Sequence, residues 1–114
     1  MDSKTIFQKI IEKEIPSDIL FEDELCIVIK DINPQAPIHL LIIPKKPIPK
    51  LADASKDDLE ILGHLMLIVG SMSRQFNVED AFNVVINNGE KAGQTVFHLH
   101  IHLLAGNTEL NLPK

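Results

Sequence analysis

Hydrophobic residues recur along the chain with two different periods, and each period predicts a different kind of element. In residues 5–14 isoleucines return every three or four positions, which indicates a short amphipathic helix. Thr5 and Gln8 have the spacing of a capping box at its start. Pro16 follows the pattern closely and is expected to end the helix, because proline cannot continue the hydrogen-bond ladder.

A longer helix is predicted over residues 55–76, where Ser55 and Asp58 repeat the capping-box spacing. This helix carries two apolar stripes. The first consists of Leu59, Leu62, Met66, Val69 and Phe76, and the second of Ile61, Leu65, Ile68 and Met72. One stripe is enough to cover a sheet, so we expect the second stripe to pack against another copy in a homodimer. The alternative is a helix buried deeply within one domain.

Shorter apolar runs, bounded by turn residues, predict five strands. They cover residues 19–22, 25–29, 38–43, 81–87 and 95–104. The segment 31–37 contains two prolines and reads as a loop, since proline cannot serve a central ladder. No repeat or linker divides the 114 residues, so a single domain over 1–114 is expected. The order of elements favours an α+β fold with a five-stranded antiparallel sheet and two helices on one face.

Composition excludes several classes of function. The formal net charge is −5, whereas a nucleic-acid-binding protein needs clustered Lys and Arg to neutralise phosphates. The start of the chain lacks the apolar run of a signal peptide, and no segment has the roughly 20 apolar residues of a membrane span. Cys26 is the only cysteine and lies in an apolar run, as a small buried hydrophobe would. We therefore expect a cytoplasmic protein without nucleic-acid or membrane partners.

The strongest chemical signal is the run HLHIHLL, from His98 to Leu104. Side chains alternate between faces along a strand, so His98, His100 and His102 are expected on one face, roughly 7 Å apart. The other face is apolar and is expected to lie under the long helix. It consists of Phe97, Leu99, Ile101 and Leu103. Packing does not demand three aligned imidazoles, so the run predicts a chemical site.

Two kinds of chemistry use such a row of histidines. Two imidazoles can share a zinc ion, but three in line diverge from a tetrahedral centre, and no second cysteine or acidic cluster adjoins them. We therefore expect no metal. The other possibility is nucleophilic catalysis, in which a neutral imidazole attacks phosphorus and its neighbours donate hydrogen bonds to the phosphate.

The residues around the histidines favour a phosphate ligand. Gly93, Gln94 and Thr95 directly precede the run and offer a flexible backbone and side-chain donors. Asp31 has two possible roles, binding a ribose diol and capping the turn. His39 begins the third strand and could face the same site, or serve packing alone.

These motifs together resemble the histidine-triad (HIT) family, and in particular its nucleotide-binding Hint branch. The resemblance rests on six stretches between Thr5 and about Gly106, and it covers nearly the whole chain. They are TIFQKIIEKEIP, FEDELC, DINPQAP, the H-x-x-x-I-P-K-K stretch that starts at His39, GHLM, and GQTVFHLHIHLL, which ends in the histidine run. The family's fold is an α+β homodimer in which the main helices pack together.

The resemblance implies roles for individual residues. His100 matches the nucleophile, His98 the histidine that orients its neighbours, and Thr95 a leaving-group contact that could help to pass a proton. His102 and His39 match contacts to the α-phosphate. The remaining nucleotide contacts are matched by Asn87, Gly93 and Gln94 on the phosphate side, Asp31 and Ile32 on the ribose, and Ile6, Phe7, Ile10 and Ile29 around the base.

The expected activity is hydrolysis of a purine nucleoside 5′-phosphoramidate or acyl-adenylate to AMP or GMP, through a nucleotidyl-histidine and without a cofactor. The alternatives are a dinucleoside polyphosphate hydrolase, a nucleotide- or partner-binding module with little turnover, and a zinc-binding protein. The chain departs from the family after Gly106, where the tail NTELNLPK lacks the arginine and tryptophan common in this branch. That departure affects the leaving-group side.

Overall fold

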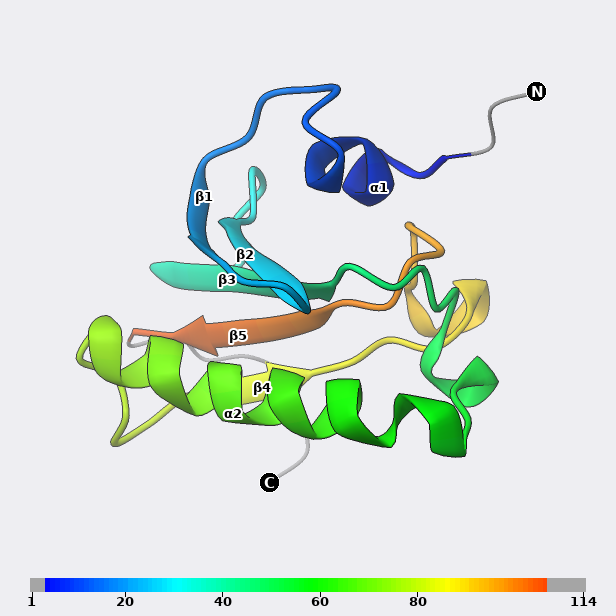
Figure 1. The fold of residues 1–114 in the computed structure, drawn as a ribbon. Coiled ribbons are helices and arrows are strands. Elements are labelled where there is room, and N and C mark those ends of the chain that lie inside the picture. Colours follow the sequence, from blue (N-terminus) through cyan, green and yellow to red (C-terminus); the bar gives the residue numbers. More distant parts are fainter. Residues whose placement is uncertain (1–3, 107–114) are drawn as a thin grey trace.

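The computed structural model describes residues 4–106 and shows one five-stranded sheet with two α-helices (Figure 1). The helices are α1 (Ile6–Ile11) and α2 (Leu59–Gln75). The strands are β1 (Ile19–Glu22), β2 (Cys26–Lys30), β3 (Ile38–Pro44), β4 (Asn83–Val85) and β5 (Ile101–Ala105). Short 3₁₀ turns lie at Leu51–Asp53, Lys56–Asp58 and Glu90–Ala92. The predicted fold class is confirmed.

All neighbouring strands are antiparallel, in the order β1-β2-β3-β5-β4. The central pair is β3 and β5, in which His39 lies opposite Leu104 and Leu41 lies opposite His102. This register places His39 and His102 on the same face of the sheet, because side chains on a strand alternate. The sheet therefore brings together two histidines from distant parts of the chain.

The two helices cover opposite faces of the sheet, which corrects the expectation that both lie on one face (Figure 1). Phe7 and Ile10 of α1 pack in one cluster with apolar residues of the strands, which are Ile27, Ile29, Leu41 and Ile43. The buried residues of α2 instead join a core with Val28, Leu40, Ile42, Ile101 and Leu103. The central strands are apolar on both faces, so each face needs a cover.

The stripe of α2 that faces its own sheet is the one predicted for the dimer interface, so that assignment was wrong. Ile61, Leu65, Ile68 and Met72 are all buried within the chain. Part of the other stripe remains open, since Leu59 is 76% exposed and Met66 is 47% exposed. The sequence revealed two stripes, but their spacing could not reveal which one faces inward.

Several elements are shorter than predicted. The first helix begins with Thr5, whose hydroxyl accepts the Gln8 amide, but it ends at Ile11, well before Pro16. The long helix begins with a 3₁₀ turn, where the predicted capping box between Ser55 and Asp58 is present. The fourth strand covers only residues 83–85, and the fifth starts at Ile101, so His98 and His100 precede it. In residues 4–106 no helix is long and apolar enough to cross a membrane.

Candidate functional site

A cavity of about 600 Å³ opens between α1, the end of β2 and the start of β5. Nine residues predicted for the site line it: Ile6, Phe7, Ile10, Ile29, Asp31, Ile32, Thr95, His100 and His102. Apolar side chains of α1 and β2 form one part of its wall, and the two imidazoles lie at another. The fold therefore joins an apolar recess to a polar end, which is the form of a pocket for an amphipathic small molecule.

His100 is held in one orientation by the chain itself. Its Nδ1 lies 2.8 Å from the main-chain oxygen of His98. A carbonyl oxygen only accepts, so Nδ1 carries the proton and the lone pair of the neutral ring is on Nε2. The ring of Phe7 contacts the imidazole edge-on, with centroids 4.8 Å apart. His100 therefore presents an unprotonated nitrogen from a fixed ring, as a nucleophile requires.

The pair His39 and His102 has a defined proton arrangement as well. The amide of Gln35 donates to Nδ1 of His39 at 3.0 Å, so the proton of neutral His39 is on Nε2. That Nε2 lies 2.9 Å from Nδ1 of His102, which must accept. His102 consequently carries its own proton on Nε2. This atom is buried and has no hydrogen-bond partner in the described part of the chain.

All four histidines of the site are neutral near pH 7. Burial lowers the pKa of His39, His98 and His100 below the usual value, and in each case nearby acceptors only partly oppose it. For His102 burial, together with the charges that His100 and His39 would carry, lowers the pKa to about 4. A neutral His102 still donates through Nε2–H. A buried donor without an acceptor destabilises the folded chain, and a bound ligand could supply that acceptor.

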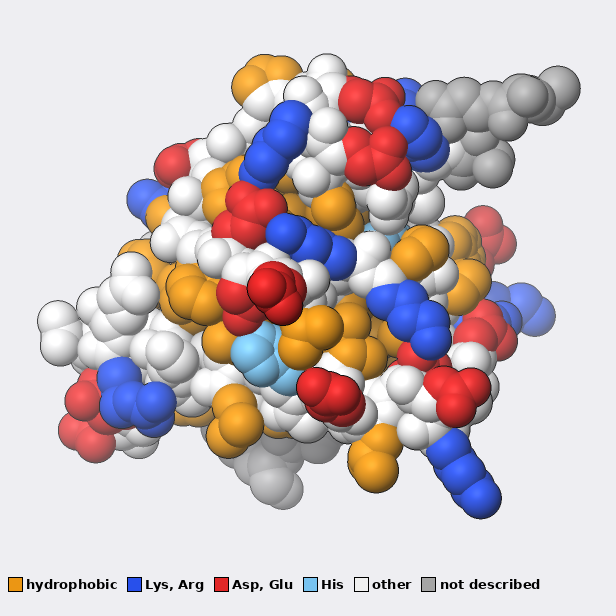
Figure 2. Space-filling view, viewed as in Figure 1, with side chains coloured by type: hydrophobic (Ala, Val, Ile, Leu, Met, Phe, Trp, Pro, Cys, Tyr) orange, Lys and Arg blue, Asp and Glu red, His pale blue; other side chains and the backbone are white. Residues whose placement is uncertain are grey.

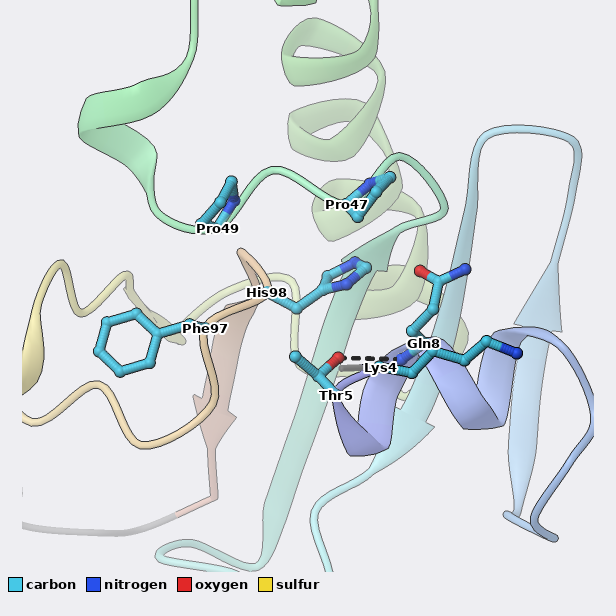
Figure 3. A pocket seen from close by; sticks show the side chains of 7 residues that line it. All are labelled: Lys4, Thr5, Gln8, Pro47, Pro49, Phe97 and His98. Carbon is cyan, nitrogen blue, oxygen red and sulfur yellow. Dashed lines mark hydrogen bonds between the residues drawn. The ribbon is translucent and has the colours of Figure 1, made fainter. Parts of the chain in front are cut away.

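The side chain of His98 is directed elsewhere. Its Nε2 donates to the main-chain oxygen of Pro44 at 2.7 Å, and it lines a second cavity of about 400 Å³ with Lys4, Thr5, Gln8, Pro47, Pro49 and Phe97. Figure 3 shows the imidazole extending toward Pro47, while the ring of Phe97 points the opposite way. Phe97 is 44% exposed, so the expectation that it packs under the long helix was wrong. His98 orients His100 through its main-chain oxygen.

Asp31 lies at the polar end of the large cavity, directly after β2. Its Oδ1 accepts the amide of Asn33 at 2.8 Å, and its Oδ2 lies 3.4 Å from Nε2 of His39. Asp31 therefore caps the turn and also lines the cavity. The carboxylate also adds negative charge near His39, which partly opposes the effect of burial on the pKa of that histidine.

The loop before the histidine run is held by the side chain of Gln94. Its Oε1 accepts the amide of Gly89 at 2.8 Å, and its Nε2 donates to the main-chain oxygens of Pro49 and Val96. Both amide protons are therefore already used within the chain. Gly93 has φ +96°, a left-handed conformation that favours glycine, and Asn87 lies beside it. Asn87, Gly93 and Gln94 do not line the large cavity, whereas Thr95 does.

Sequence reasoning missed one wall of the cavity and three main-chain groups. The wall is the segment 15–18, which follows α1 and lies over the apolar recess. Ile15 packs with the α1 core, and its apolar character was the available signal. The main-chain groups are the amide of Gln35 and the oxygens of Pro44 and His98. No residue type marks such groups in a sequence.

Asp31, His39 and His102 have ligand atoms within 4.8 Å of one another and could approach a cation. Two of these atoms, Nε2 of His39 and Nδ1 of His102, are already joined by a hydrogen bond. A metal ion would have to break that bond and displace the proton between them. A phosphate needs no such rearrangement, because the buried Nε2–H of His102 can donate to it directly, so this end of the cavity suits a phosphate better than a metal ion.

Comparisons with known proteins agree with this geometry. The family model described as "HIT domain" matches residues 12–109. A HIT-like protein of Synechocystis is 53% identical over 106 residues, which cover 93% of each chain. The crystal structure of a HIT family hydrolase from Legionella pneumophila has a TM-score of 0.92 at 37% identity and covers 97% of this chain and 100% of its own. A histidine triad nucleotide-binding protein from Candida albicans has a TM-score of 0.80 at 31% identity, covering 97% of this chain and 87% of its own.

Proposed function

The chain belongs to the HIT domain family, and from this premise we propose that it hydrolyses purine nucleoside 5′-phosphoramidates, as enzymes of the Hint branch do. The observation that carries the proposal is the fixed tautomer of His100. Its Nδ1–H is bound to the oxygen of His98, so its lone pair is at Nε2 in a ring that lines the large cavity. The products are AMP or GMP and the free amine.

In the first step, Nε2 of His100 attacks the α-phosphorus while the bond from phosphorus to the leaving amine breaks. The imidazole gains positive charge as the new bond forms, and the His98 oxygen on Nδ1–H stabilises that charge. The departing nitrogen takes a proton from water or from the hydroxyl of Thr95, which lies exposed at the cavity. The intermediate is a nucleotide bound to His100.

In the second step, water attacks the same phosphorus and the bond to Nε2 breaks, which returns His100 to its starting tautomer. The proton that the attacking water loses goes to solvent, or to Thr95 where its hydroxyl gave up a proton in the first step. The phosphate oxygens need a donor throughout, and Nε2–H of His102 is a buried donor that the described chain leaves without a partner. Because His102 is neutral, it donates one hydrogen bond without adding a full charge. A neutral donor binds the phosphate less tightly than a positively charged one would, which favours release of the product nucleotide after turnover.

The remaining ligand contacts follow from the cavity. Ile6, Phe7, Ile10 and Ile29 form the apolar part of the lining, and Asp31 lies at its polar end. We assign the purine base to the apolar part and the ribose diol to the carboxylate of Asp31. A cavity of about 600 Å³ is in the range of pockets for small organic ligands. Gln94 supports the loop that carries Thr95, rather than donating to the phosphate, since its amide protons are engaged.

The test compares two substrates on wild-type protein and on His100→Ala. We expect a higher kcat/KM for adenosine 5′-phosphoramidate than for a diadenosine polyphosphate, and no turnover by His100→Ala, which should still bind AMP. Rapid quenching in alkali, where a phosphorus–nitrogen bond persists, should trap the adduct on the peptide that contains His100. Faster cleavage of the polyphosphate would instead support the sister branch. Tight AMP binding with no turnover of either substrate would support a binding module.

A further inference from the structure

On the face of the sheet away from the cavity, three potential ligands from three elements meet. Asp23 lies in the turn between β1 and β2, Cys26 begins β2, and His64 lies in the second turn of α2. Nε2 of His64 is 2.6 Å from Oδ2 of Asp23, and the ligand atoms of all three residues lie within 4.8 Å of one another. The proposed hydrolysis uses none of these residues.

The turn holds the carboxylate of Asp23 in place before any ligand arrives. Its Oδ1 accepts the amides of Leu25 and Cys26 at 2.8 and 2.9 Å, which leaves Oδ2 for His64. Cys26 is completely buried, whereas the side chains of Asp23 and His64 are 29% and 28% exposed. On the face that carries α2, Figure 2 shows a histidine side chain reaching the surface beside acidic side chains. Solvent and ions can therefore reach the open side of the cluster.

We infer that Asp23, Cys26 and His64 form a binding site for a zinc ion, with water as the fourth ligand. A carboxylate oxygen, a thiolate sulfur and an imidazole nitrogen are the three donor types that zinc takes in proteins. Ligand bonds of about 2.0–2.3 Å place tetrahedral donors roughly 3.4–3.7 Å apart. The donors already lie within 4.8 Å of one another, and a zinc ion would replace the hydrogen bond that now joins Nε2 of His64 to Oδ2 of Asp23. Unlike the cluster of Asp31, His39 and His102, this one contains a cysteine, whose thiolate is a strong zinc ligand.

The charges match as well. In the free chain, burial and the nearby carboxylate of Asp23 raise the pKa of the Cys26 thiol to about 12, so a zinc ion must displace the thiol proton as it binds. The resulting thiolate, the carboxylate and a neutral imidazole balance the two positive charges of zinc, so a partly buried complex carries no net charge. The charge of Lys45 acts on Cys26, but its ammonium is paired with the carboxylate of Glu22 at 2.9 Å. A bound ion would tie the turn between β1 and β2 to α2 and would stabilise the folded chain in proportion to its binding.

Cobalt(II) provides a direct test, because a thiolate bound to cobalt gives an intense charge-transfer band in the near ultraviolet. Cys26 is the only cysteine of the sequence, so such a band reports this site alone. Titration of the reduced protein with Co²⁺ should give the band at one equivalent, and Zn²⁺ should displace it. Zinc should also raise the melting temperature of the wild type.

Matched variants separate this site from the histidines of the cavity. His64→Gln and Asp23→Asn keep the size of each side chain but weaken metal binding, and the cobalt affinity should fall at least about tenfold. Cys26→Ser should abolish the band. His102→Gln, on the other face, should leave it unchanged. The inference is overturned if the wild type gives no thiolate band. It is also overturned if His102→Gln loses the bound metal while His64→Gln keeps it. His64→Gln changes a partly exposed side chain, so it provides the test if the buried substitution Cys26→Ser prevents folding.

Discussion

Nε2 of His39 lies 2.9 Å from Nδ1 of His102, although the two residues are 63 positions apart in the chain. The Gln35 amide fixes the proton of His39, and this in turn leaves the free proton of His102 on the buried Nε2. His39 is thus a positioning residue for the phosphate donor. Its own two ring nitrogens are both engaged within the chain.

The first prediction concerns this pair. His39→Ala removes the donor to Nδ1 of His102, so the ring can turn or change tautomer. One lost hydrogen bond in a buried site costs about 1–3 kcal/mol, so kcat/KM should fall about 10- to 100-fold, and AMP should bind more weakly. Steady-state kinetics and calorimetric titration with AMP check this. Unchanged kcat/KM in His39→Ala, with a large loss in His102→Ala, would contradict the positioning role.

The second prediction concerns pH. The folded chain lowers the pKa of His102 to about 4, while an unfolded histidine has a pKa of about 6.5. The unfolded state therefore binds more protons between these values, and the free energy of unfolding should decrease as the pH falls from 6.5 toward 4. Each such proton accounts for at most about 1.4 kcal/mol per pH unit.

Urea unfolding at pH 7, 6 and 5 measures how the free energy of unfolding changes with pH. This range lies above the pKa values of most carboxylates, so the histidines dominate the change. His39, His98 and His100 contribute in the same direction, because burial lowers their pKa values too. The variant His102→Gln should flatten the slope relative to the wild type. Equal slopes for the two proteins would show that His102 titrates normally in the folded chain.

The third prediction concerns assembly. Leu59 and Met66 lie exposed on α2, and β4 is an edge strand, so we propose that this side of α2 packs against a second copy in a homodimer. Met66→Asp should convert the dimer to monomer, since a buried unpaired charge is costly. Ser71 is exposed and lies roughly 140° further around the helix, so Ser71→Asp is the control. If the wild-type protein sediments as a monomer at micromolar concentration, the proposal is refuted.

The fourth prediction concerns the ribose. Asp31→Asn keeps an oxygen for the Asn33 amide but removes the charge that would bind the diol. A hydrogen bond to a charged group contributes about 1.5–3 kcal/mol, so the preference for adenosine over 2′,3′-dideoxyadenosine substrates should fall by roughly tenfold or more. The ratio of the two kcat/KM values measures it. An unchanged ratio would assign Asp31 to the turn alone.

The fifth prediction concerns metals. Exhaustive chelation should leave turnover unchanged, because the nucleophile and the phosphate donor are both nitrogen atoms of neutral histidines. Stability is a separate matter, since a zinc ion at Asp23, Cys26 and His64 would lie on the other face of the sheet. Loss of activity on chelation, restored by zinc alone, would favour a metal-dependent reaction at the cavity.

Sequence alone determined the fold class and the family. The alternation of histidines with apolar residues after Gln94 placed Ile101 and Leu103 under the long helix, and the structure confirms both in that core. Local patterns suffice for such features, because strand periodicity and helix capping depend on neighbouring residues. The nine cavity residues that were predicted came from the histidine run and from the resemblance to the HIT family.

Only the tertiary structure decided how those residues can act. The tautomers of His39 and His100 depend on the amide of Gln35 and the oxygen of His98, and every residue has such main-chain groups, so no residue type identifies the ones that matter. Likewise, both stripes of α2 are apolar, and only packing shows which one faces the sheet. The meeting of Asp23 and His64, 41 positions apart, arises from the crossing of α2 over the first turn of the sheet. Long-range contacts of this kind are set by the fold as a whole, because they join segments whose local patterns are independent of each other.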